Sequence, residues 1–181
     1  MLESLIEKRR SLRALEAEPL NDKDIELVKK AASLAPSCFN NQPWRFIFIR
    51  ERLNELFTVL NKGNEWAKNA SLIIAVFSEK NLDCVIKDRE YYLFDTGIAT
   101  GFMILQLTSL GFVAHPIAGF DDLKAKQLLN IPENFVLISL IIVGKHSPDK
   151  IEYLNDYQKK IELERPERKN FKEIFYDEKY S

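Results

Sequence analysis

The chain has 181 residues, of which 46% are hydrophobic, and this length and apolar content suit one domain with a single core. Its 26 Lys and Arg nearly balance its 27 Asp and Glu, and the formal net charge of -1 argues against a nucleic-acid-binding surface. Two cysteines and two histidines, none at metal-ligand spacing, indicate neither a metal centre nor a disulfide framework.

The N-terminal segment predicts a short helix followed by a cluster of arginines. Residues 1–8 alternate charged with apolar side chains and lack the continuous apolar core of a signal peptide, so we expect a cytoplasmic protein with reduced cysteines. The helical spacing ends near Arg9. Arginines can complement the negative end of a helix, which explains Arg9 or Arg10 but not Arg13, because Arg13 lies beyond the helix.

The next segment combines a helix with a loop rich in proline and amide side chains. Asn21 is the expected N-cap of the helix, which leads into the loop at residues 36–44. Two prolines stiffen this loop, and Ser37, Asn40 and Gln42 offer neutral hydrogen-bonding groups that can read a polar heterocycle. Alternatively, the loop is an ordinary helix-to-strand connection in which these side chains only cap backbone groups.

Strands and helices then alternate. We expect a strand at 45–50, a helix at 53–60 and a short turn from Trp66. The continuous apolar run at 71–77 is typical of a strand buried on both faces, so the sheet should have helices on either side.

The longest helical candidate, residues 91–110, is apolar nearly all round, which predicts burial on all sides. It can be buried centrally in a monomer or against a second copy in a dimer, where Gly97 and Gly101 on one face would permit close approach. The stretch 96–120 contains no charged residue, but its polar residues, its glycines and Pro116 favour a buried helix and strand over a membrane span.

The last third of the chain predicts two further strands, a helix and a polar tail. Gly111 suits a helix C-cap, and strands are expected at 112–114, leading into the turn at 116–119, and at 135–143, separated by a helix at 121–129. Residues 148–181 form a C-terminal extension of the single domain 1–181. It lacks core periodicity, so it is either disordered or wraps a neighbour, and its aromatic residues favour wrapping.

Three segments taken in order resemble the nitroreductase family of flavin enzymes. They are Arg9-Arg10-Ser11-Leu12-Arg13, the loop motif with Ala32, Ala35, Pro36, Ser37, Asn40, Gln42, Pro43 and Trp44, and the turn Ile117-Ala118-Gly119-Phe120. The resemblance spans roughly residues 5–176. It implies an α+β, three-layer α/β/α fold with a mostly antiparallel central sheet flanked by helices, and a homodimer whose C-terminal tails wrap the partner subunit.

The resemblance also implies bound FMN and assigns residues to it. A basic residue such as Arg13 would lie near N1 and the C2 carbonyl of the ring, Arg9, Ser11 and Arg168 near the phosphate and ribityl chain, and a backbone amide of the 117–119 turn near N5. Many relatives have Glu where this chain has Ala118. The cofactor-binding residues predicted in this way are Arg9, Arg10, Ser11, Arg13, Pro36, Ser37, Cys38, Asn40, Gln42, Ile117, Ala118, Gly119, Arg168 and Lys169.

No side chain has the pattern of a nucleophile or general base, so the cofactor is expected to carry the chemistry. The implied activity is hydride transfer from NAD(P)H through FMN to small electron-poor acceptors, such as nitroaromatics or quinones, in a ping-pong cycle. Other chemistry of the same superfamily, reductive dehalogenation or flavin cleavage, remains an alternative, as does a non-catalytic flavin-binding redox module. Neither nucleic acid nor membrane is an expected partner.

Overall fold

The computed structural model describes residues 2–180, and its centre is a five-stranded antiparallel sheet. The strands are β1 (Leu15–Glu16), β2 (Arg45–Ile49), β3 (Leu72–Ser78), β6 (Val113–Ile117) and β7 (Val136–His146). The order β1-β7-β3-β2 makes β7 the central strand, and β6 also pairs with it. In register, Ile74 lies opposite Ile141 of β7 and Phe48 of β2. The predicted strand ending at Val143 therefore extends to His146, where it reaches β1.

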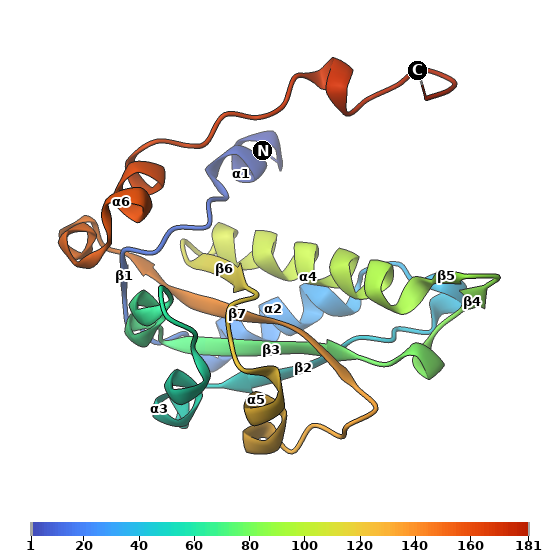
Figure 1. Ribbon diagram of the computed structural model, residues 1–181, viewed down its shortest axis with the longest axis horizontal. Helices are drawn as coiled ribbons and strands as arrows, with labels where there is room; N and C mark the ends of the chain where they lie inside the picture. Colours follow the sequence, from blue (N-terminus) through green and yellow to red (C-terminus); the bar gives the residue numbers. More distant parts are fainter. Residues whose placement is uncertain (1, 181) are drawn as a thin grey trace.

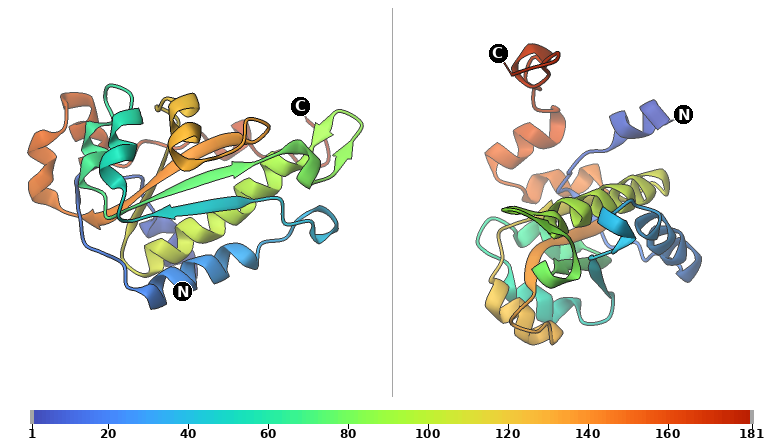
Figure 2. Two further views of the ribbon diagram at one scale, coloured as in Figure 1. Left: turned by 90° about the horizontal axis from the view of Figure 1, so that it is seen from below. Right: turned by 90° about the vertical axis from the view of Figure 1, so that its right-hand side faces the viewer.

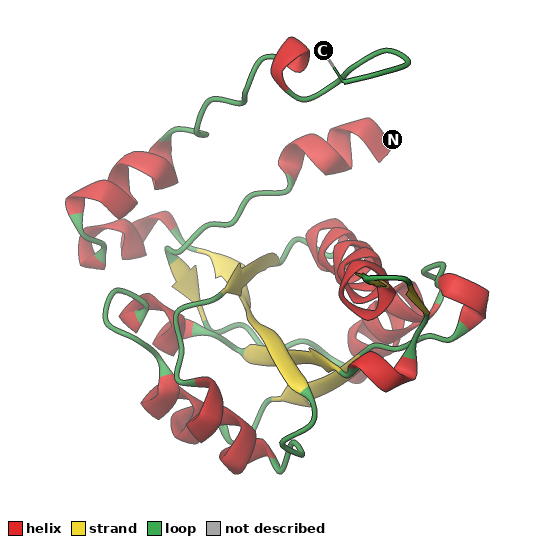
Figure 3. Cartoon of the chain, turned by 45° about the vertical axis from the view of Figure 1, so that its right-hand side comes forward, coloured by secondary structure: helices red, strands yellow, loops and turns green. Residues whose placement is uncertain are grey.

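The two central strands bury both of their faces. On one face Ile73 and Ile142 pack in a core with Trp66, and on the other Leu72 and Ile141 pack in a second core. The first core is covered by α3 (Leu53–Leu56) and α5 (Asp122–Leu129), and the second by α2 (Asp22–Ser33) and α4 (Tyr91–Ser109) (Figures 1 and 3). The predicted three-layer α/β/α fold is confirmed, as is the burial of the 71–77 run.

Helix termini follow the expected capping chemistry. The Asn21 side chain accepts a hydrogen bond from the Asp24 amide at 2.9 Å, and Asp121 caps α5 in the same way through the Lys124 amide at 3.0 Å. Gly111 follows α4 with φ of 78°, the left-handed conformation that a residue beyond a helix end commonly adopts. The helix expected at 53–60 is shorter, because after Leu56 the chain tightens into a 3₁₀ turn.

Short elements connect these layers. They are the 3₁₀ turns η1 (Cys38–Asn40), η2 (Phe57–Val59), η3 (Glu65–Asn69), η4 (Lys80–Leu82), η5 (Pro148–Tyr153) and η6 (Phe171–Glu173), and the hairpin strands β4 (Val85–Ile86) and β5 (Arg89–Glu90). The hairpin projects from the end of the sheet at which α4 begins (Figure 1).

The helix α4 is buried on one face only within this chain. Leu93, Phe94 and Phe102 are exposed, with Phe94 at 64%, so burial on all sides by a single subunit is excluded and burial against a second copy stays a prediction. Its buried residues include Ala99 and Met103, which face the sheet. The uniform apolarity therefore reflects one face packed in the core and another that this chain leaves uncovered.

The C-terminal region is more ordered than its sequence suggested. A helix, α6 (Asp156–Leu163), begins at a capping box on Asn155 and carries the buried residue Glu162. Beyond α6 the chain runs away from the sheet (Figures 1 and 2), and Arg165 donates a hydrogen bond to the carbonyl of Arg9, just after α1 (Leu2–Lys8). No helix among the described residues is long and apolar enough to cross a membrane.

Candidate functional site

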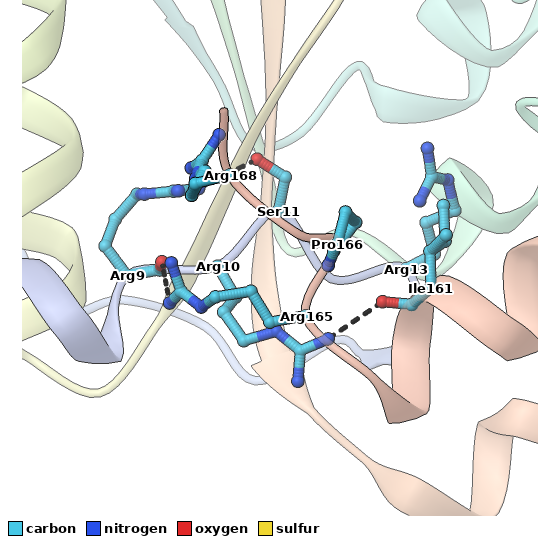
Figure 4. A pocket seen from close by; sticks show the side chains of 8 residues that line it. All are labelled: Arg9, Arg10, Ser11, Arg13, Ile161, Arg165, Pro166 and Arg168. Carbon is cyan, nitrogen blue, oxygen red and sulfur yellow. Dashed lines mark hydrogen bonds between the residues drawn. The ribbon is translucent and has the colours of Figure 1, made fainter. Parts of the chain in front are cut away.

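Two segments from opposite ends of the chain form a cationic cavity of about 240 Å³, here called the arginine cavity. One segment is the connection between α1 and β1, and the other is the end of α6 with the residues that follow it (Figure 4). Its lining residues are Arg9, Arg10, Ser11, Arg13, Ile161, Arg165, Pro166 and Arg168. Five of these eight side chains are arginines and none is acidic, so the cavity is suited to an anion.

Hydrogen bonds between side chain and backbone tie the two segments together. Arg10 donates to the carbonyls of Ile161 and Glu162 at 2.8 and 2.9 Å. In the opposite direction, Arg165 donates to the carbonyl of Arg9 at 2.9 Å. The Arg9 guanidinium donates to Ser11 Oγ at 3.1 Å. The cavity walls are therefore fixed by the arginines themselves.

A buried carboxylate completes this junction. Glu162 is 3% exposed, and its two oxygens accept from the Arg13 amide at 2.9 and 3.1 Å. One of them also accepts from the Ala14 amide at 3.0 Å and lies 3.3 Å from His146 Nε2. Glu162 thus fixes the backbone that carries Arg13 and satisfies two amides at the start of β1.

The cavity concentrates the positive charge of five arginines. The pKa of Arg9 is lowered by partial burial and by the neighbouring charges of Arg165, Arg168 and Arg10. Burial also lowers the pKa of Arg13, although the Glu162 carboxylate opposes this effect. Like charges held together in this way are costly unless an anion binds between them.

Arg13 is positioned from its other side by aromatic rings. Its guanidinium lies 5.8 Å from the centre of the Trp66 ring, and Trp66 stacks on His115 with ring centres 4.6 Å apart. His115 Nδ1 lies 3.0 Å from the Leu12 carbonyl, and burial lowers the pKa of His115 to about 4. His115 is therefore a neutral, buried residue that connects β6 to the arginine segment.

The predicted turn at residues 116–119 follows His115 in the chain. The Gly119 carbonyl accepts from Asn64 Nδ2 at 2.8 Å and from the Asn61 amide at 3.1 Å. A Cβ atom at Gly119 would lie 2.6 Å from Asn64 Nδ2, so any larger residue here would displace the Asn64 side chain. Ile117 is buried and Ala118 is exposed. None of these three residues lines the arginine cavity.

The proline-rich loop lies far from the arginine cavity within this chain. Pro36, Ser37 and Cys38 line a separate shallow cavity of about 330 Å³ together with the start of α4. The proline-rich loop and the connection between α1 and β1 lie towards opposite ends of α4 (Figure 1). Asn40 and Gln42 are exposed on the same loop. The structure thus brings together only part of the predicted cofactor set.

The loop contains the clearest error of the sequence interpretation. Cys38 and Cys84, expected to be reduced and unpaired, form a disulfide with Cα atoms 6.2 Å apart across a sequence separation of 46. The Cys38 amide also donates to the buried Asp95 carboxylate at 2.6 Å. Burial, together with neighbouring Asp83, raises the pKa of Asp95. Spacing alone could not reveal this pairing, because β2, β3 and η4 intervene and return the chain to the same loop.

The cofactor-binding residues predicted near the C-terminus lie close to the arginine cavity. Of the two residues predicted to bind the cofactor there, Arg168 lines the arginine cavity and Lys169 does not. Arg165, three residues before Arg168, also lines the cavity and was missed. Glu162 was missed because it lies in a helix whose sequence is that of a solvated surface.

Comparisons with known proteins place this geometry in context. The sequence profile described as the nitroreductase family matches residues 6–145. The chain is 34% identical over 161 residues to a protein of Archaeoglobus fulgidus that is named provisionally as an NADH dehydrogenase/NAD(P)H nitroreductase, covering 84% of this chain and 89% of that one. It is 27% identical to iodotyrosine deiodinase of Thermotoga neapolitana, covering 84% and 92% of the two chains. A crystal structure described as an oxidoreductase containing FMN superposes with a TM-score of 0.86 at 26% identity, covering 98% and 91%.

Proposed function

Because this chain belongs to the nitroreductase family, we propose that it is an FMN-dependent oxidoreductase that uses NAD(P)H to reduce small electron-poor acceptors such as nitroaromatics or quinones. The observation that carries the proposal is the arginine cavity, whose chemistry matches a terminal phosphate. When bound, FMN would supply the redox chemistry, taking hydride from NAD(P)H and passing it to an acceptor in a ping-pong cycle.

The residues of the cavity fit the phosphate of FMN. A phosphate carries up to two negative charges and accepts bidentate hydrogen bonds from guanidinium groups. Partial burial and the neighbouring charges of Arg165 and Arg168 lower the pKa of Arg9 in the free protein, a cost that a bound dianion offsets. Ser11 Oγ, already beside Arg9, adds a hydroxyl for the phosphate or ribityl chain.

Arg13 has a different role in this proposal. It lies at the inner end of the arginine segment, with its backbone fixed by Glu162 and its guanidinium over Trp66. We assign it to the N1 and C2 carbonyl edge of the ring, where negative charge develops on reduction. A fixed cation at that edge stabilises this charge and raises the potential of the cofactor.

The turn after β6 contributes backbone contacts. The bonds from Asn61 and Asn64 to the Gly119 carbonyl hold the chain at residues 117–119, and we assign a backbone amide of this turn to the ring's N5 edge. Ala118 retains a backbone amide but offers no carboxylate. The turn can therefore orient the ring without a titrating group.

The distance between the arginine cavity and the proline-rich loop supports a homodimer with composite sites. Within one chain, residues 36–42 lie at the other end of α4 from the arginine segment (Figure 1). Leu93, Phe94 and Phe102 of α4 remain exposed, as expected of a helix that packs against a second copy. We propose that the loop of one subunit completes the cofactor site of its partner, and that the aromatic C-terminal tail wraps that partner.

The absorption spectrum of the purified protein tests the cofactor and the donor. Yellow protein that bleaches on anaerobic addition of NADH or NADPH is expected, with FMN affinity falling about tenfold or more in Arg168→Ala. Lys169→Ala is the matched control, because Lys169 adjoins the same segment without lining the cavity. Protein that stays colourless after FMN is supplied would refute the proposal.

Subunit mixing tests the composite site. The double variant Arg9→Ala/Arg168→Ala damages the cavity and Ser37→Trp fills the loop side, so each homodimer should lose FMN. When the two variants are mixed and allowed to exchange subunits, about a quarter of the sites should recover, because half of the dimers are mixed and each has one intact site. No recovery in verified mixed dimers would show that both halves come from one chain.

Reductive dehalogenation is a second candidate, favoured by the relative named iodotyrosine deiodinase. Both activities use the same cofactor frame and differ in what covers the substrate. Turnover of an iodinated tyrosine that exceeds turnover of nitroaromatics and quinones would favour this candidate over the first.

A further inference from the structure

The two cysteines of the chain meet at the proline-rich loop. Cys38 begins η1 in this loop, and Cys84 lies between η4 and the hairpin strand β4. Their disulfide is the covalent connection between the loop and the segment that leads into α4. Since the sequence contains no other cysteine, every thiol measured on this protein reports on this pair.

The loop that Cys38 anchors has an unfavourable backbone. Phe39, Asn40 and Gln42 have φ values of 48°, 58° and 49°, in the left-handed region that non-glycine residues rarely adopt. Packing does not impose this conformation on Phe39, whose side chain is 87% exposed. Other contacts must therefore hold the loop.

The contacts that hold the loop converge on Cys38 and its neighbour. The Cys38 amide donates to Asp95, and the Asn41 amide donates to the Cys38 carbonyl at 3.0 Å. The Ser37 side chain accepts from the Gln42 amide at 2.9 Å. With the sulfur of Cys38 bonded to Cys84, the covalent link and these hydrogen bonds restrain the same few residues.

Within the single chain the disulfide is accessible to a reductant. Both cysteines are half-buried rather than enclosed, and Cys38 lines the shallow cavity formed with Tyr91 and Phe94. A disulfide at the surface exchanges with external thiols far more readily than one in a core.

We propose that Cys38–Cys84 is a reversible thiol–disulfide site whose reactant is a dithiol, and that its state sets the conformation of residues 37–42. A thiolate of the dithiol attacks one sulfur, the Cys38–Cys84 bond breaks, and a mixed disulfide forms. The second thiol of the reductant then displaces the remaining cysteine. Overall the protein gains two electrons and two protons as two thiols, and the dithiol becomes a disulfide. The oxidised pair holds the loop in its strained conformation. In the reduced protein, the residues with left-handed backbone conformation can relax.

This switch deepens the proposed function, because it rests in part on the assignment of Pro36–Gln42 to the FMN site. Opening the disulfide should weaken FMN binding without altering the arginine cavity, which lies at the other end of α4. Reduction would then lower the fraction of protein with FMN bound, without changing the reaction rate of the protein that retains FMN.

The test combines thiol counting with amide hydrogen exchange of the full-length protein. Protein is equilibrated with mixtures of oxidised and reduced dithiothreitol, in the presence of a chelator because Cys38, Asp83 and Cys84 are close enough together to hold a metal ion. We expect the thiol count per chain to pass reversibly from zero to two. The amides of residues 38–42 should then exchange about tenfold faster or more, whereas those of β3 should not change.

A variant separates reduction of the pair from side effects of the reductant. Cys84→Ala leaves Cys38 in place, and it should show fast exchange at residues 38–42 and the weaker FMN affinity of the reduced protein, with no response to dithiothreitol. Two free thiols after oxidation would overturn the proposal, and so would unchanged amide exchange on reduction. If FMN binds in neither state, the proposed function fails, whereas the thiol count and the exchange still decide the switch.

Discussion

Glu162 offers a sharp test of how the arginine cavity is held. Its carboxylate is almost fully buried and accepts hydrogen bonds from two backbone amides, those of Arg13 and Ala14. Glu162→Ala removes both acceptors, and Ala14 is fully buried, so at least one amide is left without access to water. Glu162→Gln can keep its Oε1 on both backbone amides, but its amide NH2 replaces the Oε2 that accepts from the Arg13 amide, so one N–H then faces another.

The magnitude follows from the number of amides left unpaired. A buried donor that loses its acceptor costs about 1–3 kcal/mol, and Glu162→Ala creates up to two such donors. We therefore expect Glu162→Ala to lower the free energy of unfolding by about 3 kcal/mol, and Glu162→Gln by about 2 kcal/mol. In a chain of this size, 3 kcal/mol corresponds to a fall in Tm of about 6–12 °C.

Thermal unfolding without cofactor, followed by FMN titration, is the assay. Glu164→Ala is the matched control, because Glu164 is exposed at the end of the same helix and should change stability by less than about 0.5 kcal/mol. FMN affinity should fall with Glu162→Ala, since the backbone that carries Arg13 loses the carboxylate that fixes it. A Glu162→Ala variant that matches the control in both measurements would show that these hydrogen bonds do not organise the cavity.

Three further predictions concern the ring side of the site. Arg13→Ala should lower the potential of bound FMN while circular dichroism stays unchanged, and an unchanged potential would remove Arg13 from the redox role. Burial lowers the pKa of His115 from 6.5 to about 4, so between these pH values the unfolded chain binds more protons than the folded one. The free energy of unfolding should therefore fall by about 3 kcal/mol as the pH drops from 6.5 to 4. Denaturant titrations at several pH values should show that His115→Gln flattens this dependence. Gly119→Ala should displace Asn64 and cost about 1 kcal/mol by chemical denaturation, and the same substitution in an Asn64→Ala background should cost much less.

The layers of the fold follow from local sequence patterns. The unbroken apolar run of β3 predicts a strand with helices on both sides, and the Asn21 cap and Gly111 mark helix ends that the structure confirms. These signals are local, because burial on two faces and capping depend on residues within one element. The same patterns left the packing of α4 open, since uniform apolarity does not distinguish packing within a chain from packing against a second copy.

The site was predicted less completely, for a different physical reason. Arg9 and Arg13 were found because they belong to a recognisable motif, whereas Glu162 and Arg165 act on backbone groups about 150 residues away. A bond from a side chain to a distant backbone group leaves no complementary residue to detect in sequence. The Cys38–Cys84 pairing was missed in the same way, because only the folded path of β2 and β3 brings the two cysteines together.

The two chain ends hold each other in place around the arginine cavity. Each end supplies side chains that bind the backbone of the other: Arg10 holds the end of α6, Arg165 holds the N-terminal segment, and Glu162 holds the start of β1. Such reciprocal bonds do not depend on the side chains of the residues whose backbone is bound. They form only when both chain ends are in place together. An anion between the arginines stabilises both ends at once, so binding and the ordering of the termini must be coupled. The charge that makes the cavity costly when empty is therefore the same charge on which the proposed binding of a phosphate depends.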